Sequence, residues 1–377
     1  MDLGFDEAQQ MLKNSAREFL EQECPTTFVR EMEDNERGYT AEFWGKIAEL
    51  GWLGLVLPEE YGGQGLSYFD LTLLLEEMGR AMVPGPFFST VILGGMSILE
   101  AGNDAQKSEY LPQIANGNLI ATMALTEPTA TYEASGIETT ATKQGDGYVI
   151  NGTKLFVPDA QGADVMVVVA RTQKSSDPTQ GITAFLVDPK AQGVTVTPLV
   201  TIAADKQAEV EFKDVSVPAS AVLGEVDQGW PTVKRILDLG AVGKCAEMLG
   251  GADRVLEMTV DYVKERVQFG RPIGSFQAIQ HHCANMAIDV EGCRYVTYQA
   301  AWRTSERLPS TTEIAIAKGW VSDAYRRICA LGHQSHGAIG FTREYDLQLF
   351  TRRAKTQEVS YGDSDFHREL VAQSLGL

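Results

Sequence analysis

The spacing of apolar residues divides the chain into three segments. From residue 5 to about residue 118, apolar side chains recur at three- and four-residue steps, as in Phe5, Leu12, Ala16, Phe19 and Leu20. This is the period of an α-helix with one buried face. Loops rich in Gly and Pro, at residues 58–65 and 84–86, interrupt the helical pattern. The first segment, residues 1–120, is therefore predicted to be an α-helical domain.

The pattern changes to strict alternation near residue 121. Residues 140–152 alternate and turn at Gly145-Asp146-Gly147, which is the signal of a β-hairpin. Short β-rich runs bounded by Gly, Pro or Asp follow at residues 164–171, 182–188, 194–200 and 208–217. These runs lie too close together to have helices between them. Residues 121–226 are therefore predicted to be a small, barrel-like β domain and not a dinucleotide-binding βαβ domain.

Helical periodicity returns over residues 227–377 and the helices become longer. Residues 233–266 predict one long helix or two abutting ones, and residues 278–306 and 311–335 predict two more. Long consecutive amphipathic helices with short links indicate a helical bundle of four helices. In the tail AKTQEVSYGDSDFHREL (354–370), one helix is predicted to stop at Tyr361-Gly362 and another to begin behind a capping Asp363.

Composition narrows the classes of partner. The formal net charge of −19 argues against nucleic acid or an anionic membrane as a partner, because both need basic patches. No apolar run approaches the roughly 20 residues of a membrane span, and the start MDLGFDEAQQ lacks the features of a signal peptide. The five cysteines form no CxxC pair and the five histidines no metal-binding spacing. We expect a cytoplasmic protein without a metal site.

Four short stretches together resemble the acyl-CoA dehydrogenase family over essentially the whole chain. They are ALTEP (124–128), NGTKLFVPDAQGAD (151–164), ERVQFGRPIGSFQAIQH (265–281) and HQSHGAIGFTREYDLQLFTRRAK (333–355). The order of the three segments also agrees with that family's fold of an N-terminal α domain, a middle β domain and a C-terminal four-helix bundle. The ERxxFGxxI–xFQ stretch and the QxxGxxGF junction are specific in combination, although each piece alone is a weak signal.

The resemblance implies FAD as the cofactor. A planar isoalloxazine needs backbone donors from a strand edge and an aromatic wall, and Arg266 suits the charge of the pyrophosphate. An alternative interpretation makes Arg266 a solvated cation at a helix end and Phe269 a core residue. The positions that match the family's cofactor contacts are Leu125, Thr126, Phe156 and Pro158 for the flavin; Gln268, Phe269 and Gln277 for the nucleotide half across a subunit interface; and Gln334 and Gly337 beside the adenosine diphosphate arm.

The chain departs from the family's pattern at the flavin. The family usually reads TEPGAGSD where this chain reads TEPTATYE, and usually has Trp-x-Thr where this chain has Phe156-Val157-Pro158. The second change removes a hydroxyl that ordinarily bonds the flavin, and proline has no N–H to replace it. We therefore expect altered redox tuning of the flavin.

Both of the family's usual catalytic glutamates are replaced. Tyr361 stands at the position in the tail turn, and Gly240 stands at the second position in the bundle helix. Glu247 lies two helical turns beyond Gly240 on nearly the same face, in an apolar setting, and is our predicted catalytic base. The alternatives are that Glu247 pairs with Lys244 or Arg254, or that Asp363 or Glu133 is the base. The predicted substrate contacts are Tyr132, Asp238, Gly240 and Tyr361.

The function that the resemblance implies is α,β-dehydrogenation of an acyl-CoA thioester, with electrons passed to an electron-transfer flavoprotein. The small residues Gly240, Ala241, Gly250 and Gly251 suggest room for a bulky, branched or alicyclic acyl group. The resemblance also implies a homotetramer, or a heterotetramer with a related chain. Two alternatives remain open: a non-catalytic partner subunit, and a redox-neutral acyl-CoA lyase, decarboxylase or desulfinase on the same fold.

Overall fold

The computed structural model describes residues 4–377 and divides the chain into two compact units. One unit contains the residues up to Arg30, Ser67–Val83 and Ala241–Leu377. The other contains Glu31–Leu66 and Pro84–Gly240. The N-terminal helical segment is thus shared between the units, and the helix α7 (Trp230–Glu265) contributes residues to both.

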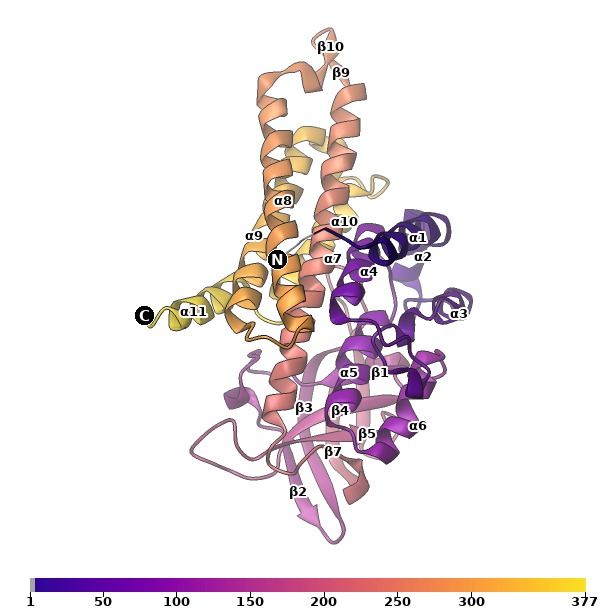
Figure 1. Ribbon diagram of the computed structural model, residues 1–377, viewed down its shortest axis with the longest axis vertical. Helices are drawn as coiled ribbons and strands as arrows, with labels where there is room; N and C mark the ends of the chain where they lie inside the picture. Colours follow the sequence, from indigo (N-terminus) through magenta and orange to yellow (C-terminus); the bar gives the residue numbers. More distant parts are fainter. Residues whose placement is uncertain (1–3) are drawn as a thin grey trace. The chain divides into compact units, whose positions relative to one another are not determined.

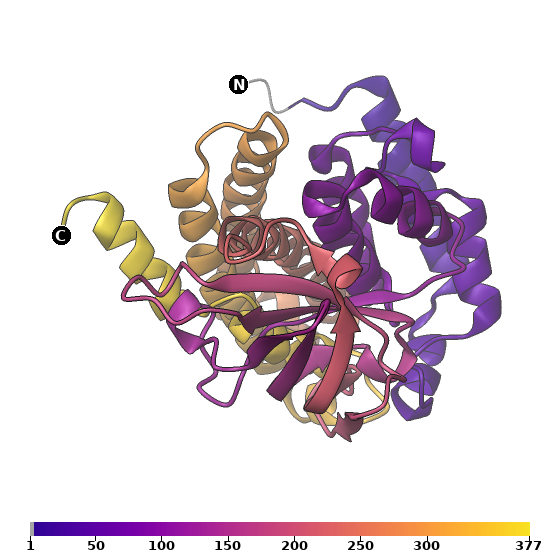
Figure 2. The same cartoon turned by 90° about the horizontal axis from the view of Figure 1, so that it is seen from below.

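Within the described residues, the second unit is built on one eight-stranded sheet, seen from below in Figure 2. The strand order is β6-β7-β3-β2-β4-β5-β8, and β1 pairs in parallel with β4. Strands β2 and β3 form the hairpin predicted from the sequence, with Gln144 opposite Gly147 across the turn. The strands are β1 (Ala121–Ala124), β2 (Thr140–Gln144), β3 (Gly147–Pro158), β4 (Val165–Arg171), β5 (Ile182–Val187), β6 (Val194–Leu199), β7 (Gln207–Pro218) and β8 (Val222–Leu223).

Short helices complete the same unit. They are α3 (Ala41–Glu49), α5 (Met96–Ala101), α6 (Asp104–Ala115) and the π-helix η3 (Ser89–Gly95). The π-helix is buried and packs against β1. Gly94 permits this contact, because a Cβ at that position would overlap the Cβ of Ala121. The helical periodicity of this segment did not predict the π-helix, whose wider turn leaves the 3.6-residue period.

The first unit is a helical assembly around α9 (Thr311–His336), which packs against α8 (Gln277–Ser305), α10 (Leu347–Val359) and α11 (Ser364–Ser374) (Figure 1). Buried residues of α9 recur at helical spacing, as in Ile314, Val321, Tyr325 and Ile328. Figure 1 shows the short hairpin of β9 (Val267–Gln268) and β10 (Arg271–Pro272) where α7 ends and α8 follows.

Two N-terminal helices complete the first unit, namely α1 (Glu7–Glu23) and α4 (Tyr68–Ala81), and α2 (Thr26–Asp34) begins in it. Adjacent buried carboxylates on α4, Glu76 and Glu77, join them to the bundle. Lys13 of α1 lies 2.7 Å from Glu76 and Arg17 lies 2.9 Å from Glu77. Tyr298 of α8 donates a 2.6 Å hydrogen bond to Glu76. These buried charges are paired, as burial requires, and they specify how α1, α4 and α8 pack together.

Candidate active site

In the sheet unit, the chain that leaves β1 is fixed by β3. The backbone N–H of Leu155 donates a 2.8 Å hydrogen bond to the Thr126 carbonyl, and the Lys154 ammonium donates a 3.0 Å bond to the Leu125 carbonyl. Within residues 4–377, neither the N–H nor the hydroxyl of Thr126 has a hydrogen-bond partner. An unused backbone donor at a strand end is the group that a flavin's acceptor atoms require, so these residues fit the predicted cofactor.

Phe156 and Pro158 lie at the end of β3, immediately beyond the Thr126–Leu155 contact. The pairing of β3 with β7 shifts register between Lys154 and Val157, which marks a bulge. Phe156 has a φ of 55°, and its side chain is 51% exposed. The Pro158 carbonyl accepts a 2.6 Å hydrogen bond from the Thr122 hydroxyl. A left-handed backbone is unfavourable for an aromatic residue, and such strain is frequent at functional sites.

The sequence reasoning missed the buried pair Lys154 and Glu127. Lys154 Nζ lies 2.7 Å from Glu127 Oε1, and both side chains are almost completely buried. Burial lowers the pKa of the Lys154 ammonium to about 8, although the adjacent carboxylate acts to raise it. A signal was present, because Lys154 shares the inward face of β3 with Tyr148 and Ile150. A lysine at an inward position of an alternating strand needs a buried partner.

The TEPTATYE loop (126–133) follows Leu125, and Arg171 holds the chain just beyond its C-terminal end. Arg171 donates hydrogen bonds of 2.8 Å to the Ala134 carbonyl and 2.9 Å to the Ile137 carbonyl just beyond it. Tyr132 is half-buried and Glu133 is exposed. Asp238 and Gly240 lie further along the chain, on the first part of α7, where Asp238 forms an ion pair with Lys234 and Gly240 is buried.

Glu247 lies in the helical unit on α7. Its Oε2 accepts from Lys244 Nζ at 2.7 Å and from Gln357 Nε2 of α10 at 2.9 Å. The Lys244 pairing is the alternative that the sequence allowed, and the setting of Glu247 is more polar than its apolar neighbours indicated. Among the described residues, no group is hydrogen-bonded to Glu247 Oε1.

Gly250 and Gly251 do not supply space for a substrate. A Cβ at Gly250 would overlap the Glu76 carbonyl of α4, and a Cβ at Gly251 would overlap the Tyr325 hydroxyl of α9. The space beside both glycines is therefore occupied by the helices that pack closely against α7. The expectation of a bulky acyl group retains only Gly240 and Ala241 as support.

The tail turn is held by groups from two helices. Tyr361 and Gly362 both have positive φ values, 59° and 94°, between α10 and α11. Lys318 of α9 is fully buried, and its Nζ donates to the Glu358 carbonyl at 3.0 Å and the Gly362 carbonyl at 2.9 Å. His367 Nε2 lies 2.9 Å from the Tyr361 carbonyl. Asp363 caps α11 by accepting from Phe366 N at 2.9 Å, so the predicted cap is confirmed.

The residues predicted for the nucleotide half of FAD are on the surface of the helical unit. Phe269 is 91% exposed with a φ of 53°, although its ring touches Phe276. Gly337, with a φ of 68°, ends α9 in a conformation that glycine tolerates. Arg266, Gln268, Gln277 and Gln334 are also exposed. Phe269 is thus not a core residue, and these side chains remain accessible to a ligand or to a neighbouring subunit.

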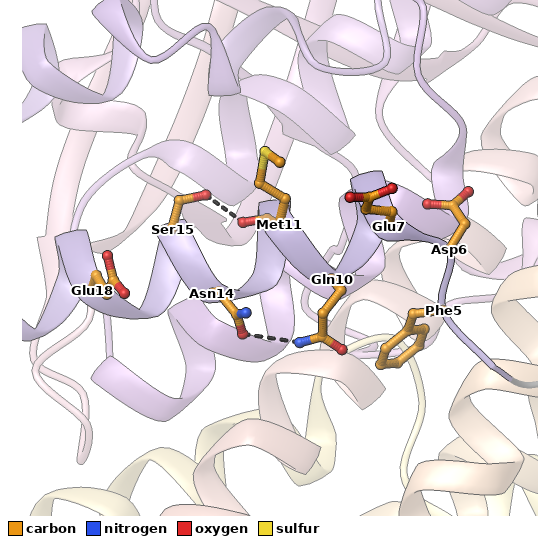
Figure 3. A pocket seen from close by; sticks show the side chains of 8 residues that line it. All are labelled: Phe5, Asp6, Glu7, Gln10, Met11, Asn14, Ser15 and Glu18. Carbon is orange, nitrogen blue, oxygen red and sulfur yellow. Dashed lines mark hydrogen bonds between the residues drawn. The ribbon is translucent and has the colours of Figure 1, made fainter.

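In residues 4–377 no group of three or more His, Cys, Asp or Glu side chains is placed to hold a metal ion, and no helix is long and apolar enough to cross a membrane. An open hollow lies along one side of α1 (Figure 3), lined by residues between Phe5 and Glu18. Two hydrogen bonds join lining residues, from Gln10 to Asn14 and from Ser15 to the Met11 carbonyl.

Comparison with known proteins identifies the family. Three family models match: "Acyl-CoA dehydrogenase, N-terminal domain" over residues 6–118, "middle domain" over residues 122–215 and "C-terminal domain" over residues 227–376. The chain belongs to the acyl-CoA dehydrogenase family, and its fold is the one predicted from the sequence. This is a family of oxidoreductases that use FAD. A solved chain described as an FAD complex matches this chain with 25% identity and a TM-score of 0.93.

Individual relatives cover the full chain. The probable acyl-CoA dehydrogenase YngJ of Bacillus subtilis (strain 168) is 33% identical over 380 residues, which is 100% of both chains. The caffeyl-CoA reductase-Etf complex subunit CarC of Acetobacterium woodii is 32% identical and covers 98% of this chain and 99% of its own. The structure of butyryl-CoA dehydrogenase from Megasphaera elsdenii has a TM-score of 0.93, with 32% identity and 100% coverage of both chains.

Proposed function

We propose that this chain dehydrogenates an acyl-CoA thioester between its α and β carbons. The observation that carries the proposal is the strand end at Leu125–Thr126, where an unused backbone donor lies beside Phe156 in the motif that the family uses for its flavin. FAD supplies the acceptor for the hydride that leaves the β carbon. Leu125, Thr126, Phe156 and Pro158 would hold the flavin, while Arg266, Gln268, Phe269, Gln277, Gln334 and Gly337 would hold the nucleotide half.

We propose Glu247 as the group that takes the α proton. Lys244 and Gln357 hold one oxygen of the carboxylate and leave Oε1 to accept a proton. Two donors on one oxygen also fix the orientation of the side chain, which a general base requires. Tyr132, Asp238, Gly240 and Tyr361 are proposed as substrate contacts. The small residues Gly240 and Ala241 support a branched or ring-bearing acyl group.

The test is reduction of the bound flavin under anaerobic conditions by a panel of acyl-CoA thioesters. The best substrate then compares Glu247→Gln with Tyr361→Phe. Glu247→Gln keeps the shape and the hydrogen-bond acceptor but loses basicity, so flavin reduction should slow by at least ~10²-fold. Tyr361→Phe should slow it far less, because a phenol with a pKa near 10 is a poor base. Reduction of the Glu247→Gln flavin at the wild-type rate would remove Glu247 from the chemistry.

A second candidate is a partner subunit that completes the site of a related catalytic chain. It is favoured by the absence of a carboxylate at both usual positions, Tyr361 and Gly240, together with the ion pair of Glu247 with Lys244. Expression of the chain alone separates the candidates. A yellow protein whose flavin is reduced by one acyl-CoA supports the dehydrogenase. A protein that gains flavin and activity only with a second chain supports the partner subunit.

We also propose a tetramer that is built through the bundle, with electrons passing to an electron-transfer flavoprotein. One face of α8 and α9 carries exposed apolar side chains at helical spacing: Ile288, Tyr295, Ile316 and Trp320. Trp320 lies against Gly292 of α8, where a Cβ would stand 3.0 Å from the indole nitrogen. Apolar faces of this kind on a helical unit are typical of subunit interfaces. The relative CarC, named as part of an Etf complex, supports the electron acceptor.

A further inference from the structure

Lys154 and Glu127 form the centre of a hydrogen-bonded cluster at the flavin motif. Lys154 Nζ donates to Glu127 Oε1 at 2.7 Å and to the Leu125 carbonyl at 3.0 Å. The Glu127 carboxylate also accepts the N–H of Glu138 at 2.9 Å and the N–H of Thr139 at 3.0 and 3.1 Å. One buried ion pair therefore joins the end of β1, the residues that lead into β2 and strand β3.

Stability alone does not account for such a pair. Taking two charges out of water costs about as much as their attraction returns, and apolar residues of similar size often stabilise a fold equally well. What the pair does uniquely is fix the direction of one peptide group. The Leu125 carbonyl and the Thr126 N–H belong to the same planar trans peptide, so they point in opposite directions. A bond from Lys154 to the oxygen therefore sets where the Thr126 N–H points.

The same bond strengthens the donor. A charged hydrogen bond on a carbonyl polarises its peptide group, and the N–H on the other side becomes a better donor. The next carbonyl, that of Thr126, is already held by Leu155 N, so the segment cannot rotate freely. The only unused polar groups of Thr126 in the described chain are this N–H and the side-chain hydroxyl.

We propose that Lys154, held in place by Glu127, is a positioning residue for FAD, which orients and polarises the Leu125–Thr126 peptide so that its N–H meets the flavin. Lys154 itself is enclosed by protein and does not touch the cofactor. The pair acts on the isoalloxazine half of FAD and leaves the adenosine diphosphate half unaffected. The proposal rests on the cofactor and not on the acyl-CoA activity.

The test measures cofactor affinity without turnover. Wild-type protein stripped of FAD is titrated with FAD by flavin fluorescence and, separately, with ADP by calorimetry. In the double variant Lys154→Met/Glu127→Gln both charges are removed together, so no buried charge is left unpaired, and the introduced amide oxygen still accepts the N–H groups that close the loop. We expect FAD to bind at least tenfold more weakly and the flavin absorption bands to shift, while ADP affinity stays within twofold of wild type.

Two further variants separate positioning from general destabilisation. Thr183→Val removes a buried hydroxyl of the same unit, which accepts from Asp227 N at 2.8 Å, and should leave FAD affinity unchanged. Glu127→Gln alone removes the carboxylate that holds Lys154, so it should also weaken FAD binding, by no more than the double variant does. The proposal is overturned if the double variant binds FAD as the Thr183→Val control does, or if ADP affinity falls as much as FAD affinity.

Discussion

Replacement of Gly250 by alanine should destabilise the protein, because α7 and α4 touch through their backbones at this point. A Cβ at Gly250 would overlap the Glu76 carbonyl and stand 2.8 Å from Arg80 N, where an ordinary contact needs 3.4 Å or more. These neighbours are helix backbone and cannot rotate away, so α4 has to move. Overpacking of this kind costs about 3 kcal/mol, and the helix propensity of alanine returns at most ~1 kcal/mol.

The matched control is Gly319→Ala in α9 of the same unit. Its Cβ would meet His367 Cβ at 3.7 Å and the Ser364 carbonyl at 3.8 Å, which are ordinary contacts. Only the gain in helix propensity remains, up to ~1 kcal/mol. In thermal unfolding we expect Gly250→Ala to lower Tm by roughly 5 °C and Gly319→Ala to raise it by about 2 °C. Equal Tm values for the two variants would refute the close crossing of α4 and α7.

Two other predictions follow from the helical unit. Ile288→Glu, on the exposed apolar face of α8, should convert the proposed tetramer into smaller species in light scattering. Met11→Glu, an equally exposed site on α1, should leave the mass unchanged. An unchanged mass for Ile288→Glu would exclude this face as the interface. Burial lowers the pKa of Lys318 from its ordinary value of 10.5 to about 8, so between these pH values the unfolded chain binds more protons and stability rises with pH. The difference in unfolding free energy between the wild type and Lys318→Met, measured by urea unfolding, should therefore increase by about 2 kcal/mol from pH 8 to pH 10. An equal difference at the two pH values would contradict this prediction.

The sequence predicted those parts of the fold that local patterns determine. Alternation and the Gly-Asp-Gly turn located the β2–β3 hairpin. Helical periodicity located α7, although it left open whether this stretch is one long helix or two abutting ones. Asp363 was predicted as a cap because a cap is defined by residues a few positions apart. Each of these features depends on interactions within a short stretch of chain, and such interactions can be read from spacing.

Contacts between distant segments were not accessible in this way. Gly250 and Gly251 were interpreted as open space near a substrate, but α4 and Tyr325 occupy the space beside them. A glycine in a helix has the same appearance in a sequence whether a ligand or another backbone approaches it. Glu247 was predicted in an apolar setting because its neighbours along the chain are apolar, while Gln357, which bonds to it, lies 110 positions away.

The buried lysines show how this difficulty bears on the site itself. Neither Lys154 nor Lys318 belongs to a motif that would reveal its role. Each nevertheless donates to a backbone carbonyl in a segment that the family resemblance selected. Lys154 bonds to the Leu125 carbonyl, and Lys318 bonds to the Gly362 carbonyl in the tail turn. Because every residue has a backbone carbonyl, a sequence does not show which of these oxygens accepts a hydrogen bond from a side chain. In this chain the residues proposed to touch the cofactor or substrate were found by resemblance, and the groups that orient them become visible only when the backbone is in place.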